Sequence, residues 1–270
     1  MDVKMSEKTV LAPYERVLLA RRKDRMQITD YIDLLFDDFI EMKGDRLYAD
    51  DPSILGGVAL FHGKPVTVIG HRKGKTTEES IKYNFGMTSP EGYRKALRLM
   101  KQAEKFKRPV ISFIDTPGAF PGLEAENRGQ SIAIAENLAA MSALTVPVIA
   151  IVTGEGSSGG ALAIGVADTV WMLENAVYSI LSPEGFASIL WKDSKRAPEA
   201  CAIMKITPEE LKAFGLIDGI IPEGKRSIRA MDTMLEFELN RLSKMSASSL
   251  VAKRYEKYRQ IDGIYRPGEK

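Results

Sequence analysis

The chain has 270 residues, of which 44% are hydrophobic and 27% charged, and this composition is typical of a globular protein with a sizeable core. Its 38 basic and 36 acidic residues nearly cancel, so charge alone indicates neither a nucleic-acid partner nor a membrane surface. One cysteine and two histidines exclude an intrachain disulfide and a metal site rich in Cys or His, and we expect no metal. Without a long apolar span or a leader pattern, we expect a cytoplasmic protein.

The first third of the chain predicts a helix and then a hairpin. After Thr29, a plausible N-cap, apolar residues recur at helical spacing, and the helix is expected to end near Gly44. Two strand-like runs, 58–61 and 66–69, flank a turn and predict a β-hairpin. The polar segment 70–89 is expected to be a loop.

That loop is basic, and the next helix begins directly after it. Arg72, Lys73 and Lys75 are typical of a solvated loop, with steering of ligand phosphates as the alternative. Pro90 suits a first helical position and starts a helix.

The middle of the chain alternates strands with helices, which predicts right-handed parallel crossovers. The expected elements are a strand over 110–115, a helix over 124–143, a strand over 146–153, a helix over 161–166 and a strand over 169–173. Helix starts at Pro183 and Pro208, a strand over 216–221 and helices over 227–244 and 250–260 follow. We expect one domain, with an N-terminal helical extension (1–52), a core (53–225) and C-terminal helices (226–270).

Residues 154–163, with the sequence GEGSSGGALA, follow a strand and open a small-residue helix, where free backbone N–H groups bind negative charge. Three sites fit this segment. Gly154, Gly156 and Gly159 match G-x-G-x-x-G, and Glu174 lies where a dinucleotide fold places a ribose-binding carboxylate. A dinucleotide fold would not explain a second loop rich in Gly and Pro, residues 115–122.

The same segment also matches G-x-S-x-G, which would make Ser158 a nucleophile. No histidine follows His71, so a triad in the usual order is excluded and a Ser-Lys dyad stays open. The third interpretation is an oxyanion hole in which the N–H groups of Gly159 and Gly160 face a developing negative charge. The structural alternative is that these glycines only allow close helix packing.

A second loop, 115–122 with the sequence DTPGAFPG, ends the preceding strand. Because loops after adjacent parallel strands leave at the same edge of the sheet, both loops are expected to face one crevice. Two prolines would hold the N–H groups of Gly118 and Ala119 in a rigid frame. The alternative is a stiff turn in which Asp115 bonds to its own loop.

Together with residues 86–87, 90–100 and 179–193, these loops closely resemble the α-subunit family of bacterial acetyl-CoA carboxylase carboxyltransferases. The resemblance covers about residues 31–223, and 207–218 further looks like a segment of the crotonase superfamily. Ser157 stands where that family commonly has Gly.

The resemblance implies an α/β fold, a crotonase-like spiral of ββα units with helical extensions at both ends. It implies transfer of a carboxyl group from carboxybiotin, held on the biotin carboxyl carrier protein, to acetyl-CoA, giving malonyl-CoA for fatty acid synthesis. A zinc-bearing β subunit would complete the site in an α2β2 assembly, and ATP would be used only by a separate biotin carboxylase. No nucleic acid or membrane is expected as a partner.

The family's biotin-side oxyanion hole maps onto Gly159 and Gly160. We expect five further residues to line the substrate site: Gly118, Ala119, Gly156, Ser158 and Ala161. The ureido anion left on biotin can take the proton from the acetyl group, so no side-chain base is expected, and Glu155 and Glu184 would order the loops or serve as core or cap residues. A stand-alone acyl-CoA hydratase or isomerase, an NAD-dependent oxidoreductase and a non-catalytic regulatory subunit remain as alternatives.

Overall fold

The computed structural model describes residues 11–261, so both outer ends of the expected helical extensions, 1–10 and 262–270, lie outside it. Its sheet has the strand order β1-β2-β3-β4-β5-β6-β8, with β7 pairing separately with β5. The strands are β1 (Asp37–Glu41), β2 (Ile54–Phe61), β3 (Lys64–His71), β4 (Val110–Thr116), β5 (Val148–Ser157), β6 (Thr169–Leu173), β7 (Val177–Ser179) and β8 (Gly219–Ile221).

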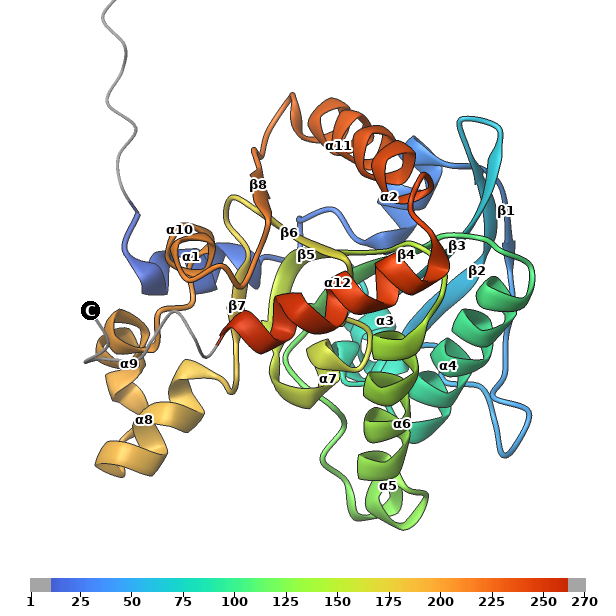
Figure 1. Cartoon of the computed structure of the whole chain (residues 1–270). Helices are drawn as coiled ribbons and strands as arrows, with labels where there is room; N and C mark the ends of the chain where they lie inside the picture. Colours follow the sequence, from blue (N-terminus) through green and yellow to red (C-terminus); the bar gives the residue numbers. More distant parts are fainter. Residues whose placement is uncertain (1–10, 262–270) are drawn as a thin grey trace, which may run out of the picture.

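The α-helices lie around this sheet (Figure 1). They are α1 (Pro13–Ala20), α2 (Ile28–Leu35), α3 (Thr77–Lys82), α4 (Pro90–Lys105), α5 (Leu123–Asn127), α6 (Gln130–Ala143), α7 (Ser158–Leu162), α8 (Pro183–Trp191), α9 (Ala197–Met204), α10 (Pro208–Ala213), α11 (Ser227–Leu242) and α12 (Ala247–Gln260). Two 3₁₀ turns are η1 (Asn84–Gly86) and η2 (Ser194–Arg196). In Figure 1, α2 and α11 lie above the sheet and α4 and α6 below it.

The core is built on the parallel strands β3 to β6, as the alternating pattern predicts. β5 is buried at all ten positions, so it runs through the centre of the core. Its first half pairs with β6 and its last three residues with β7, so one strand supports two neighbours on the same side. The segment α8 to α10 lies beside the sheet rather than on its faces (Figure 1).

The helix expected from Thr29 to Gly44 is wrong beyond Leu35, because residues 37–41 form edge strand β1. The spacing of apolar residues in this short stretch is compatible with a helix or with an edge strand. Antiparallel pairing with β2 stabilises the strand. Gly57 permits that pairing, because a Cβ there would lie 2.1 Å from the carbonyl oxygen of Ile40. Asp38 adopts φ 51° within the irregular register of the pair.

Several further boundaries differ from the expectation, and the helix expected over 161–166 is found at Ser158–Leu162. The loop 70–89 contains α3 and η1, and the helix 124–143 divides at Gly129, which adopts φ 84°. β5 extends through Ser157 and α7 begins at Ser158, so Gly154 and Gly156 are strand residues. The last strand starts only at Gly219. Within residues 11–261, no helix combines the length and the apolar character needed to cross a membrane.

Candidate active site

The glycine segment turns sharply where β5 meets α7. Ser158, the first residue of α7, adopts φ 59°, a left-handed conformation that is costly for a residue with a Cβ. The amide groups of the first helical turn have no acceptor inside the helix. No hydrogen bond from the N–H of Gly159 or Gly160 to another group occurs within residues 11–261. Neither amide therefore has an acceptor within this part of the chain, where Gly159 is half-buried and Gly160 is buried.

The second loop meets the first at Gly160. A Cβ on Gly160 would lie 2.6 Å from the amide nitrogen of Ala119 and 3.0 Å from the hydroxyl oxygen of buried Tyr93. Only glycine allows this approach of one backbone to the other. In contrast, a Cβ on Gly159 would find only Ile134, at an ordinary 3.6 Å. The structure thus brings together the two loops that the sequence placed at one edge.

The second loop is held by its own side chains. The N–H of Gly118 donates to Thr116 Oγ1 at 3.0 Å, so this amide is already engaged. Thr116 Oγ1 lies 2.7 Å from the carbonyl oxygen of Gly86, and Phe120 N–H donates to Thr88 at 3.0 Å. The loop is therefore tied to the segment before α4. Ala119 forms an isolated bridge with Thr88.

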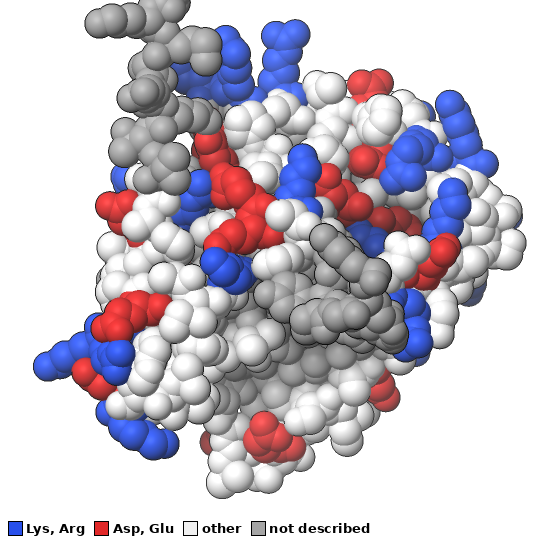
Figure 2. Space-filling view, turned by 60° about the vertical axis from the view of Figure 1, so that its left-hand side comes forward, with Lys and Arg blue, Asp and Glu red and all other residues white. Residues whose placement is uncertain are grey.

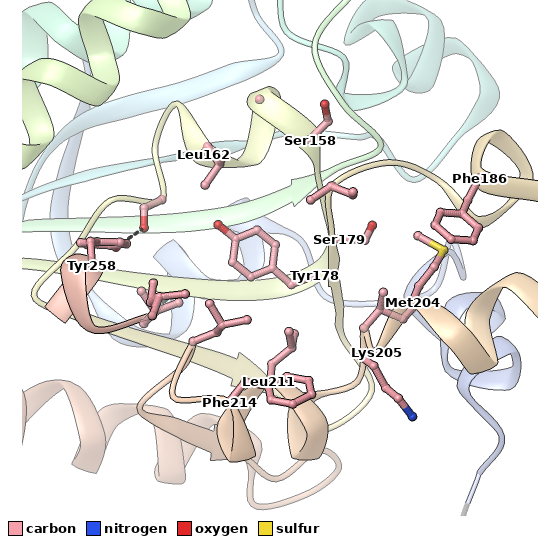
Figure 3. Close-up of a pocket in the computed structure, with 17 residues that line it drawn as sticks. Ser158, Leu162, Tyr178, Ser179, Phe186, Met204, Lys205, Leu211, Phe214 and Tyr258 are labelled. Atoms are coloured by element: carbon pink, nitrogen blue, oxygen red, sulfur yellow. Dashed lines mark hydrogen bonds between the residues drawn. The ribbon is translucent and has the colours of Figure 1, made fainter. Parts of the chain in front are cut away.

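A cavity of about 540 Å³ opens beside Ser158 and Gly159. Its walls come from α7, β7, α8, α10 and α12, and Figure 3 shows Tyr178 projecting between Leu162 and Leu211. Other lining side chains include Ile180, Phe186, Met204, Lys205, Phe214 and Tyr258. The cavity is lined mainly by apolar side chains, which is the usual character of a small-molecule site.

Only one charged side chain lines this cavity among the described residues. Lys205 turns its ammonium away from the cavity in Figure 3 and pairs with Glu210 at 3.2 Å. Burial raises the pKa of Tyr178, so its hydroxyl stays neutral. Figure 2 shows this side of the molecule, with charged side chains over the upper part and along the lower left edge. A neutral organic ring fits this cavity better than a phosphate does.

The cavity could not be foreseen from the sequence. It depends on the placement of α8, α10 and α12 against α7, and these segments are separated by up to about a hundred positions in the chain. The available signal was the apolar content of residues 179–191, which form β7 and α8 in part.

The expected basic loop is a set of paired charges. Arg72 pairs with Glu41 at 3.3 Å and Lys75 with Asp30 at 2.5 Å. Lys73 turns inward and lies 2.7 Å from Asp115 Oδ1. These ion pairs argue against a free patch for phosphates.

A second cation continues this ion-pair cluster. Lys73 also lies 3.0 Å from Glu155 Oε2, while Arg21 contacts Glu155 and Glu184, each at 2.7 Å. Although burial opposes it, the pKa of Glu155 is lowered because Lys73 and Arg21 stabilise the anion. The expectation that Glu155 and Glu184 order the loops is consistent with these contacts.

The other interpretations of the glycine segment lack support in the geometry. Gly154 and Gly156 belong to β5, and the carboxylate of Glu174 accepts from the N–H of Glu223 instead of facing a phosphate loop. His71 is buried with its ring near the backbones of Phe113 and Gly160, and His62 pairs with Asp232 at the hairpin turn. Among the described residues no hydrogen bond joins the Ser158 hydroxyl to a histidine or a lysine, and Lys205, which lines the same cavity, pairs with Glu210.

Comparison with known sequences gives one consistent match. The family described as acetyl co-enzyme A carboxylase carboxyltransferase-like matches residues 2–262. A protein of Clostridium acetobutylicum named acetyl-coenzyme A carboxylase carboxyl transferase subunit alpha is 56% identical over 265 residues, 95% of this chain and 97% of the relative. The protein of that name from Halalkalibacterium halodurans is 56% identical over 93% of this chain and 80% of its own length.

Solved structures show the same fold at low identity. Transcarboxylase 12S with methylmalonyl-coenzyme A bound has a TM-score of 0.67 at 20% identity. The structural match covers 89% of this chain and 47% of that chain. The geranyl-CoA carboxylase β subunit of P. aeruginosa has a TM-score of 0.67 at 15% identity, over 94% of this chain and 47% of that one. The crotonase-type α/β fold expected from the sequence is confirmed.

Proposed function

Because this chain belongs to the acetyl-CoA carboxylase carboxyltransferase family, as a biotin-dependent carboxyltransferase of the α-subunit type, we propose that Gly159 and Gly160 form the oxyanion hole for biotin. Their N–H groups would face the ureido oxygen, on which negative charge develops as carboxybiotin releases CO2. Donors placed where charge develops lower a barrier by about 3 to 4 kcal/mol each. The contact of Gly160 with the Gly118–Ala119 backbone is the observation that carries this proposal.

The cavity supplies the rest of the binding site in this proposal. Leu162, Tyr178 and Phe186 offer the apolar walls that a bicyclic ring needs, and Gly159 also lines the cavity. Ser158, Gly156 and Ala161 shape the turn between β5 and α7. The amide of Ala119 remains beside Gly160, while that of Gly118 is bound to Thr116.

The residues of this chain then act by binding and orientation. The amides hold the ureido oxygen, the two loops fix that position, and the cavity keeps water from the reacting carboxyl group. When bound, biotin would supply the carboxyl group and the proton acceptor for carboxylation of acetyl-CoA to malonyl-CoA, while Gly159 and Gly160 would hold its ureido oxygen. A β subunit bearing zinc would bind acetyl-CoA.

We propose the remaining partners from the same family membership. The biotin carboxyl carrier protein would deliver carboxybiotin after an ATP-dependent biotin carboxylase has loaded it, in an α2β2 assembly in the cytoplasm that serves fatty acid synthesis. The whole chain would act as one carboxyltransferase domain.

The test measures carboxyl transfer between malonyl-CoA and biotin. We expect the purified chain alone to be inactive and the mixture with the β subunit to be active. Carboxyl transfer by the isolated chain would contradict the need for a β subunit, and an inactive mixture would contradict the proposal.

A further inference from the structure

We propose that Lys73 is a positioning residue for carboxyl transfer, because its ammonium group joins the two loops whose backbones meet again at Gly160. This inference rests on the proposed role of Gly159 and Gly160. It concerns a residue that touches neither the cavity nor the two glycines.

Lys73 lies just beyond the end of β3, and the ends of β4 and β5 are its neighbours. It lies two residues beyond β3, which pairs in parallel with β4, which in turn pairs in parallel with β5. Its ammonium is 2.7 Å from Asp115 near the end of β4 and 3.0 Å from Glu155 near the end of β5. One cation therefore connects the ends of all three strands.

The Lys73 side chain is confined along its length. The N–H of Gly74 donates to Gln27 Oε1 at 2.9 Å, which fixes the backbone beside it. Gly86 lies so close that a Cβ there would be 2.7 Å from Lys73 Cγ. The carbonyl oxygen of Gly86 lies 2.7 Å from Thr116 Oγ1, so the lysine stem rests on a residue already tied to the second loop.

The pairing of β4 with β5 is irregular at this point. Ile114 pairs with Val152, but Thr116 pairs with Gly156, so β5 carries two more residues than β4 in this interval. The carboxylate of Asp115 fills the gap, because its Oδ1 accepts the N–H of Glu155 at 3.0 Å. Bulges of this kind redirect the chain that follows, and here that chain is Gly156 to Gly160.

Asp115 and Glu155 would repel each other without a cation. Lys73 is 18% exposed and Glu155 9% exposed at the side chain, so water screens this repulsion poorly. Arg21 still neutralises Glu155 when Lys73 is absent, whereas Asp115 loses the ammonium 2.7 Å away. Removing Lys73 is therefore expected to displace Asp115 and to disturb the irregular pairing of β4 with β5.

The ion pairs of Lys73 with Asp115 and Glu155, called the clamp here, lie shortly before the contact at Gly160 in both loops. Gly118 and Ala119 follow Asp115 by three and four residues, and Gly159 and Gly160 follow Glu155 by four and five. The loops touch at Gly160 without a side chain between them, so a shift of either loop at the clamp moves the amides. A misplacement of about 1 Å can slow catalysis about 100-fold.

The experiment compares variants of the chain reconstituted with the β subunit, using carboxyl transfer between malonyl-CoA and biotin. We expect Lys73→Met to lower kcat on the order of 100-fold with little change in KM for malonyl-CoA. Lys73→Arg, which can still bridge two carboxylates, should restore most of kcat. Lys75→Met is the matched control, since it removes a neighbouring lysine that pairs with Asp30 and with neither Asp115 nor Glu155, and its kcat should equal that of the unmodified chain.

Assembly with the β subunit is measured by size-exclusion chromatography for each variant. If Lys73→Met does not fold, Lys73→Gln, which keeps one donor for the carboxylates, takes its place. A folded variant with unchanged kcat overturns the inference, and so does a Lys73→Arg that is as slow as Lys73→Met. Gly160→Ala separates the two levels: if it transfers at the normal rate, the proposed oxyanion hole fails, whereas if it is inactive and Lys73→Met is normal, only the role of Lys73 fails.

Discussion

A Cβ on Gly160 would lie 2.6 Å from the amide nitrogen of Ala119, which means that the two loops of the site touch backbone to backbone. This distance is below any real Cβ contact, and the atom met is main chain that cannot rotate away. The contact therefore fixes the position of one loop relative to the other.

Gly160→Ala should lower kcat of carboxyl transfer about 100-fold, because the added methyl group pushes the Gly118–Ala119 backbone away from the turn. Gly159→Ala is the matched comparison, since its methyl group would meet only Ile134 at 3.6 Å. It should lower kcat far less. Steady-state kinetics of the reconstituted complex check this prediction, and equal rates for both variants would contradict it.

Ile180→Trp should raise KM for free biotin while leaving thermal stability unchanged. Ile180 lines the cavity and is 77% exposed, so a larger ring narrows the cavity without entering the core. Ile189→Trp is the control, because Ile189, a residue of α8, is also exposed but does not line the cavity. An unchanged KM in Ile180→Trp would mean that biotin binds elsewhere.

Arg254→Met should lower the free energy of unfolding by about 3 to 5 kcal/mol, because it leaves a buried carboxylate unpaired. The guanidinium of Arg254 is fully buried, contacts Asp168 at 2.8 Å, and donates to the carbonyl oxygens of Met141 and Leu144. It fastens α12 to the end of α6. Urea unfolding measures the change, and Lys253→Met, at an exposed position of the same helix, should have little effect.

His71 should make the protein less stable in acid. Burial, together with the nearby Lys73 ammonium, lowers the pKa of His71 to about 3 from an ordinary 6.5. Between these values the unfolded chain binds a proton that the folded chain does not, so stability falls as pH is lowered, by up to about 1.4 kcal/mol per pH unit.

The measurement for His71 is the free energy of unfolding between pH 6.5 and pH 4. His71→Gln should remove part of the slope. Identical slopes in the variant and the unmodified protein would show that His71 does not contribute.

The strands that the sequence predicted correctly are those whose formation depends on a local pattern of apolar residues. The run 110–115 is apolar and β-branched and is buried on both faces, so it forms β4 almost as expected. The stretch 37–41 was predicted wrongly because its outcome depends on pairing with a glycine twenty residues away. The helix α3 had a local signal that was overlooked: Thr76 accepts the N–H of Glu79 at 3.1 Å in a capping box.

The meeting of the two glycine-containing loops was predictable, because both loops follow adjacent parallel strands and so leave the sheet at the same edge. The ion pairs behind them were not. Arg21 and Glu155 are 134 positions apart, and their contact depends on where α1 lies against the end of β5. No local pattern distinguishes Lys73, which is nearly buried, from Lys75, which is half-exposed.

The complete burial of β5 bears on how this enzyme can be altered, in evolution or by engineering. Ten consecutive positions without a free surface leave little scope for substitution that does not disturb neighbouring strands. Part of the cavity wall consists of short helices beside the sheet, and two of these, α8 and α9, are followed by left-handed residues, Lys192 and Lys205. New ligand preferences are therefore most easily acquired by changing α8 to α10, while the buried strand β5 is inherited intact.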